Sequence, residues 1–406
     1  MRITWWPPRG SSRRSLTAGL VIAALAVALI AAIALRPSAT GPGASPGASA
    51  IAVATPSQGT PAPTATAPAP SPTAGATPEI VLVPAPMTGL LVTAAAAQQH
   101  PIAVMIDDHA GARPQSGFNS ASIVWQAPAE GGIPRYMLIF QDKVPAAVGG
   151  IRSAREYFIE WAAEWDAMYT HAGGSPQAMS TLSSSGHGQL VWNADEFRWS
   201  ALGYFWRVKN YVAPHNLYTD GAHLRKLAGA IGMKDGPITP NWTLAVGRND
   251  VDRPTGNVIK VVYPYESITY RYDPVRNAYL RFINRSKQAQ VDAADGLVVA
   301  PTNVVILRMH FGPLNDSHPA KHRLEAADVG HGEAWISTGG VTIKGSWKKA
   351  SVSAPTLLFD GHGKPVTLTA GQTFVQVLPL TYPFTIANGQ FAAPMGPQVG
   401  DGLTPS

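Results

Sequence analysis

Polar and charged side chains gather between residues 107 and 218, at the points where short apolar runs stop. In a folded sheet, such strand ends are where side chains meet a ligand. Some of these residues could act as general acid or base: Asp107, Asp108, Glu130 and His171. Others could bind a ligand through charge, amide, hydroxyl, ring or close backbone approach: Arg113, Gln115, Arg152, Arg155, Gly173, Gly174, Ser175, His215, Asn216 and Tyr218. The sequence therefore predicts a functional site.

Two arginines stand where a helix is predicted to begin. Arg152 precedes that helix and Arg155 lies in its first turn, where the helix dipole disfavours a cation by about 0.3–1 kcal/mol. A docked anion would remove this penalty, because guanidinium groups bind carboxylate or phosphate bidentately. The alternative is that both arginines pair with carboxylates such as Asp107, Asp108 or Glu130. The sequence leaves both interpretations open.

A second candidate for ligand contact is the run Gly173-Gly174-Ser175 that follows His171. Glycines let a backbone approach a ligand closely, although the same run is also typical of an ordinary strand-to-helix turn. This turn and the arginines would converge if their strands are parallel neighbours. Alternation along a strand sends Asp107 and Asp108 to opposite faces, so only one of them is expected in a shared site.

The familiar catalytic and metal motifs are absent from the sequence. It has no His-Glu-x-x-His run, no Gly-x-Ser-x-Gly elbow and no Walker loop. It also has no cysteine, which excludes disulfides, thiolate nucleophiles and cysteine zinc sites. We therefore expect neither a cofactor nor a bound metal.

The elements that must position these residues form a predicted α/β domain over residues 100–235. Apolar runs predict strands at 102–106, 123–126, 136–140 and 167–171. Apolar residues at helical spacing predict a helix from 154 to 165, with Ser153 and Glu156 as a capping box. Further helices are predicted after Ser175-Pro176 and over 222–231, the latter capped by Asp220 or Thr219.

A mainly β domain, a sandwich or a barrel, is predicted over residues 237–385. Residues 268–272 and 278–283 alternate around a turn and predict a hairpin. Strands are also predicted at 304–309, 333–338, 341–344, 356–359 and 373–378. Residues 388–406 are expected to be a flexible tail.

The first 78 residues indicate an attachment to a membrane. Residues 16–35 form an uncharged run of 20, long enough at about 1.5 Å per residue to cross a layer of about 30 Å. The arginines before it predict a cytoplasmic basic tail at 1–15 and an extracytoplasmic remainder, as a single-pass protein of the cell membrane. The alternative is a cleaved signal peptide. Residues 37–78, rich in Pro, Ala and Thr, predict a disordered stalk.

The formal net charge of +6 comes mainly from this first segment. Its five arginines leave 26 basic against 25 acidic residues in the rest of the chain. That balance excludes the basic footprint that nucleic-acid binding requires.

Several of these motifs together resemble one known family. The segments 101–117, 130–132, 152–155, 171–177 and 213–218, with 302–305 and 345–347 in the β half, are similar to the YerB-like family of extracytoplasmic bacterial lipoproteins. The resemblance implies a two-domain envelope protein, and the family has no assigned function. This chain departs from its lipoprotein members because it has no cysteine to carry a lipid, and the run at 16–35 would replace that lipid.

Two functions follow as hypotheses. The first is a binding module that recognises an anionic or glycan component of the cell envelope, a polymer or a protein, through Arg113, Arg152, Arg155 and the glycine turn. The second is an envelope hydrolase or transferase with acid–base chemistry from Asp107 or Asp108 together with Glu130 or His171. In both, the membrane is a partner through the N-terminal helix.

Overall fold

The computed structural model describes residues 81–182, 187–188 and 190–388. The predicted basic tail, membrane segment, stalk and residues 389–406 of the C-terminal tail lie outside them. No helix among the described residues combines the length and the apolar character needed to span a bilayer.

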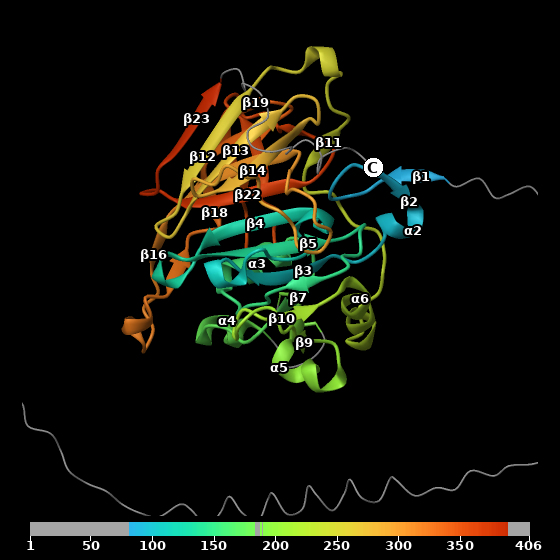
Figure 1. Cartoon of the computed structure of the whole chain (residues 1–406), viewed down its shortest axis with the longest axis vertical. Coiled ribbons are helices and arrows are strands. Elements are labelled where there is room, and N and C mark those ends of the chain that lie inside the picture. The colour runs from blue at the N-terminus through green and yellow to red at the C-terminus, as the bar shows by residue number, and fades with distance from the viewer. Residues whose placement is uncertain (1–80, 183–186, 189, 389–406) are drawn as a thin grey trace, which may run out of the picture. The chain divides into compact units, whose positions relative to one another are not determined.

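One ten-stranded sheet takes strands from both halves of the chain. In spatial order its strands are β20 (Leu357–Asp360), β19 (Val341–Lys349), β18 (Gly330–Thr338), β15 (Asn303–Met309), β22 (Thr373–Pro379), β4 (Ile123–Pro128), β5 (Pro134–Phe140), β3 (Ile102–Asp107), β7 (Met168–His171) and β8 (Trp192–Asp195). The halves meet where β22 pairs in parallel with β4, with Thr373 opposite Ile123. Figure 1 shows β22 in red next to β4 in teal.

The other strands form smaller sheets. A four-stranded antiparallel sheet has the order β14 (Ala278–Ile283), β13 (Ser267–Asp273), β12 (Asn257–Val262) and β23 (Phe384–Asn388). The remaining sheets are β1 (Leu82–Pro84) with β2 (Leu91–Thr93), β6 (Val148–Gly149) with β10 (Leu217–Thr219) and β9 (Trp206–Arg207), β11 (Thr243–Ala245) with β21 (Thr367–Thr369), and β16 (Phe311–Pro313) with β17 (Leu324–Ala326).

The helices in the described residues are short. The α-helices are α2 (Ala94–Ala97), α3 (Glu156–Ala163), α4 (Pro176–Thr181), α5 (Glu196–Trp199) and α6 (Gly221–Ala230). The 3-10 turns are η1 (Ala110–Ala112), η2 (Phe118–Ser120), η3 (Glu130–Gly132), η4 (Ser200–Leu202), η5 (Asp250–Asp252) and η6 (Pro319–Lys321).

Side chains alternate along the central strands and contribute to two hydrophobic cores, one on each face of the large sheet. Met105 belongs to the core that α3 covers, where the Trp125 and Trp161 rings stack with centroids 4.8 Å apart. Its neighbour Val104 belongs to the core on the other face, which includes Ile259 of the four-stranded sheet. The two sheets therefore pack against each other around the second core.

Strands dominate both halves of the described chain, as expected for the second half. The predicted sandwich or barrel at 237–385 is corrected in one respect: the larger sheet of this half is not confined to these residues, because it is continuous with strands of the first half. Pairing between β4 and β22 joins residues about 250 positions apart, as Thr373 and Ile123 illustrate. Local periodicity carries no information on such a pairing.

Local signals predicted two of the three expected helix starts correctly. Ser175 caps α4 by accepting a hydrogen bond from Ala178 N at 3.2 Å, and Asp220 caps α6 through His223 N at 2.8 Å. The capping box at Ser153 is wrong, because α3 begins only at Glu156 and its cap position is Arg155. The Ser153 hydroxyl instead accepts a hydrogen bond from Arg155 Nη1 at 3.2 Å.

Candidate functional site

The backbone brings the ends of β3 and β7 together with the segment before α3. β3 and β7 are parallel neighbours. Arg152 N donates to Met105 O at 2.9 Å, and Ala172 N donates to Arg152 O at 3.0 Å. Ala154 N donates to Gly173 O at 2.8 Å. The predicted convergence of the arginine segment and the glycine turn is therefore confirmed.

Asp107 lies at the centre of this junction and is almost fully buried. Its Oδ2 lies 2.7 Å from His215 Nδ1 and 2.9 Å from Arg152 Nε, and its Oδ1 accepts from His109 N at 3.0 Å. Burial raises the pKa of Asp107, but Arg152, the N–H of His109 and His215 together bring it below its ordinary value. Asp107 is thus an ionised carboxylate that holds an arginine and a histidine in place.

Arg155 is held by Glu130 from the turn between β4 and β5. Arg155 Nε donates to Glu130 Oε1 at 2.6 Å and Arg155 Nη2 to Glu130 Oε2 at 2.5 Å, a bidentate pair. Burial raises the pKa of Glu130, while the hydrogen bonds and charge of Arg155 lower it below its ordinary value. Of the two interpretations of Arg152 and Arg155, pairing with carboxylates is the one that the structure shows.

A third arginine, which the sequence reasoning missed, lies between these two pairs. Arg135 of β5 stands opposite Asp107 of β3, and its half-buried side chain has two buried nitrogens, Nε and Nη1, without a hydrogen-bond acceptor in the described chain. Burial and the positive charges of Arg155 and Arg152 lower the pKa of Arg135 to about 10. It remains a cation at neutral pH.

We call these five residues the arginine cluster: Arg135, Arg152, Arg155, Asp107 and Glu130. Three guanidinium groups share two carboxylates, so the cluster carries one uncompensated positive charge. The Arg152 side chain, 28 % exposed, brings that charge to solvent. The arrangement can bind an anion.

Asp108 lies in a separate interior network, as strand alternation predicted. Arg113 Nη2 donates to Asp108 Oδ1 at 2.6 Å and also pairs with Glu266. Gln126 Nε2 donates to Asp108 Oδ2 at 2.6 Å, and Gln126 Oε1 accepts from Arg281 Nη2 at 2.9 Å. Burial and the charge of Glu266 hold the pKa of Asp108 well above its ordinary value. Arg113 therefore serves this network and not the arginine cluster.

The other predicted residues make contacts within the folded protein. Gln115 Nε2 donates to Asp107 O at 2.9 Å. His171 is fully buried, with Nε2 2.8 Å from Asn193 Oδ1. Gly174 bridges to Ala154, Asn216 Oδ1 accepts from Arg207 Nη1 at 3.0 Å, and the ring of Tyr218 stacks on Tyr211.

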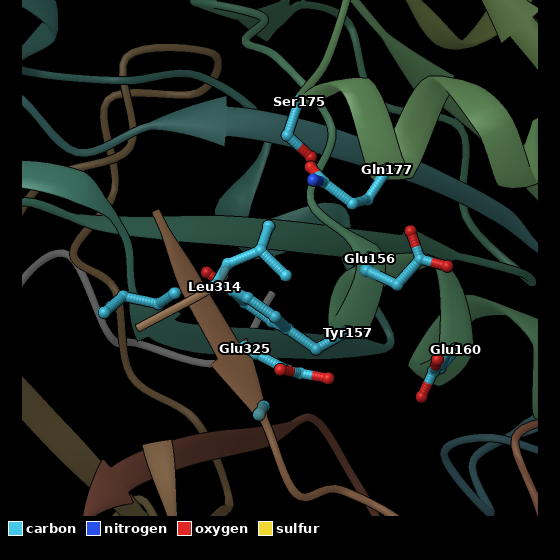
Figure 2. A pocket seen from close by; sticks show the side chains of 9 residues that line it. Glu156, Tyr157, Glu160, Ser175, Gln177, Leu314 and Glu325 are labelled. Atoms are coloured by element: carbon cyan, nitrogen blue, oxygen red, sulfur yellow. The ribbon is translucent and has the colours of Figure 1, made fainter. Parts of the chain in front are cut away.

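Sequence reasoning also missed an acidic pocket beside α3. Glu156, Glu160 and Glu325 line a cavity of about 300 Å³, together with Tyr157, Ser175, Gln177, Leu314, Leu324 and Ala326. Figure 2 shows the pocket, whose side chains come from α3, from the start of α4, from β17 and from the residue after β16. The spacing of Glu156 and Glu160, one helical turn apart, was the available signal. The described residues place no three potential ligands where they could hold a metal ion.

Comparison with known proteins gives the family. Residues 87–234 match the family described as the N-terminal domain of "Protein of unknown function (DUF3048)", and residues 259–375 match its C-terminal domain. The chain is 30 % identical over 315 residues to "Putative lipoprotein YerB" of Bacillus subtilis (strain 168), covering 75 % of this chain and 89 % of that protein. The chain belongs to the YerB family. The predicted resemblance is confirmed.

A solved structure of the same family supports the fold. The crystal structure of the YerB protein from Bacillus subtilis matches with a TM-score of 0.66 at 28 % identity, covering 75 % of this chain and 99 % of that one. The alignment of nearly the whole YerB chain shows that both halves described above belong to the common fold of the family.

Proposed function

We propose that this protein is a membrane-associated extracytoplasmic binding protein whose arginine cluster takes an anionic group of a cell-envelope polymer. The name of the Bacillus subtilis relative supports the location, since it describes a lipoprotein. In this chain the uncharged run at 16–35 would provide the attachment in place of a lipid. The stalk at 37–78 would carry the folded part away from the bilayer.

The observation that carries the proposal is the charge excess of the arginine cluster. Arg155 is fully engaged by Glu130, whereas Arg135 keeps two nitrogens without acceptors. Buried donors are satisfied in most proteins, so unsatisfied N–H groups beside the partly exposed Arg152 favour an external acceptor. Phosphate and carboxylate groups match the planar geometry of guanidinium donors.

The alternative of an envelope hydrolase or transferase is not favoured. Asp107 and Glu130 are each tied to an arginine, and their lowered pKa values make them poor proton donors at neutral pH. The pKa of Asp108 is raised, but its carboxyl group is fully buried and paired with Arg113. His171 is fully buried and hydrogen-bonded through both ring nitrogens. These contacts support a binding role for the site.

The test compares a charged and a neutral polymer. We expect the full chain to bind poly(glycerol phosphate) and not an uncharged N-acetylglucosamine oligomer, with an affinity that falls as salt rises. Arg152→Gln should weaken binding by about tenfold to a hundredfold, since a charge-assisted hydrogen bond contributes about 1.5–3 kcal/mol. Surface plasmon resonance measures both affinities.

The matched control is Arg285→Gln, because Arg285 is exposed and lies on another part of the fold. This variant removes the same charge and should change the affinity by less than about twofold. Thermal unfolding verifies that both variants are folded. Equal losses in the two variants, or equal binding of the neutral oligomer, would refute a specific anion site at the cluster.

A further inference from the structure

The acidic pocket is a cavity whose charged lining residues are all negative. Its volume of about 300 Å³ lies at the lower end of the range for small-ligand sites. Three of its nine described lining residues are glutamates, and none of the nine is lysine, arginine or histidine. Figure 2 shows Glu156 and Glu160 on one side of the cavity and Leu314 across from them. The wall across from these two glutamates is mainly apolar and also carries Glu325.

Buried oxygens around this pocket lack hydrogen-bond donors. Glu156 accepts from the Thr181 hydroxyl through Oε1, but its buried Oε2 has no donor in the described part of the chain. The same holds for Oε1 of Gln177, which also lines the pocket. Behind Glu160, Asp328 is only 4 % exposed, and the two carboxyl groups are hydrogen-bonded to each other. Since buried acceptors are normally satisfied, the oxygens of Glu156 and Gln177 call for a ligand that donates.

The nearest cations are engaged elsewhere. Lys349 is fully buried and donates to Glu164 Oε1 at 2.8 Å and to Ala354 O at 2.8 Å. Arg323, next to β17, pairs with Asp316 at 2.5 Å. The glutamates of the pocket therefore have no dedicated counter-charge among these side chains.

At neutral pH Glu160 holds a proton that a bound cation would displace. Burial, with the neighbouring carboxyl groups of Asp328 and Glu156, raises the pKa of Glu160 to about 9, against a smaller opposing effect of Lys349. Burial also raises the pKa of Glu156. A positive ligand stabilises the ionised carboxylates, so its binding should release protons near neutral pH.

We propose that the acidic pocket binds an alkylammonium group, with the ammonium at Glu156 and Glu160 and the alkyl chain against Leu314, Leu324 and Ala326. A bare metal ion fits less well, because the cavity is large and the described residues place no three ligands around one point. The ammonium could belong to a free amine or to a lysine-type side chain in a peptide. This inference is independent of the arginine cluster.

The test titrates the full chain in detergent solution with 1,5-diaminopentane, followed by calorimetry. We expect saturable binding, with protons released at pH 7 and an affinity that rises between pH 6 and pH 9 as Glu160 ionises. The neutral analogue 1,5-pentanediol should not bind. Acetyl-lysine-amide, with the free ε-ammonium, separates the two sources: tighter binding than the diamine assigns the pocket to a peptide side chain, and weaker binding assigns it to free amines.

Variants decide whether binding occurs in this pocket. Glu156→Gln with Glu160→Gln keeps the shape and removes the charge, and it should weaken diamine binding by about tenfold or more, which corresponds to about 1.4 kcal/mol. Because Glu325 is exposed, Glu325→Lys disturbs the fold least and should have a similar effect. Glu333→Gln, an exposed glutamate of β18, is the control and should change little. Unchanged binding in both pocket variants, or binding of the diol, would overturn the proposal.

Discussion

At the scale of single residues, neighbours in sequence serve different parts of the molecule. Asp107 holds Arg152 and His215, whereas Asp108 joins Arg113 in the interior network. The sequence predicted this separation because side chains alternate along a strand. It did not predict Arg135, whose role depends on standing opposite Asp107 across two strands. Which charged residues face each other depends on the register between two strands, and the sequence of one strand does not determine that register.

The first prediction concerns the pH dependence of Asp107. Its folded pKa is lower than its unfolded pKa, so its ion pairs stabilise the protein above about pH 4, and this stability is lost as pH falls through the folded pKa. Asp107→Asn should therefore lower the free energy of unfolding by about 1–3 kcal/mol at pH 7. Urea unfolding at pH 7, 5 and 3 measures the difference from wild type. A penalty that stays constant down to pH 3 would show that the charge of Asp107 is not the cause.

At the scale of elements, helix starts were predicted where the capping residue acts alone. Ser175 and Asp220 cap α4 and α6 as expected, because each side chain needs only the backbone three residues ahead. The box at Ser153 failed because the backbone of 152–154 is hydrogen-bonded to Met105 of β3 and to Gly173 in the turn after β7. A chain held in extended form by two strands cannot begin a helix there.

The second prediction tests the cap of α6. Asp220→Ala removes the acceptor of His223 N and should lower the free energy of unfolding by about 1 kcal/mol, whereas Asp220→Ser, which also caps, should recover most of it. Urea unfolding followed by circular dichroism gives both values. If alanine and serine cost the same, the side-chain cap contributes nothing to the stability of α6.

At the scale of the whole molecule, the two halves form one sheet and share one interior polar network. Arg281 of β14 reaches Gln126 of β4 at 2.9 Å and the Tyr136 hydroxyl of β5 at 2.8 Å. Glu266, beside β13, bonds to the same Gln126 at 2.8 Å. Charged side chains of the second half are thus buried against side chains of the first half. We therefore expect the described halves to unfold together.

The third prediction follows from this coupling. Arg281→Met leaves the carboxyl groups of Asp108 and Glu266 without one of their two arginines, and breaking a buried network of this kind costs about 3–5 kcal/mol. Tryptophan fluorescence and circular dichroism should report one shared transition, shifted to lower urea by the same amount. Arg285→Met, at an exposed position, is the control. Two separate transitions in the variant would indicate that the halves fold independently.

The amino-acid sequence by itself determined the local elements of this protein: the strands predicted at 102–106, 123–126 and 278–283, the caps at Ser175 and Asp220, the opposite facing of Asp107 and Asp108, and the family. These depend on periodicity and on contacts within a few residues. Only the tertiary structure decided the joint sheet through β4 and β22, the place of Arg135 between two ion pairs, and the acidic pocket between α3 and β17. Each of these arises from pairing between distant segments, and the burial that sets its charge and pKa exists only once those segments have met.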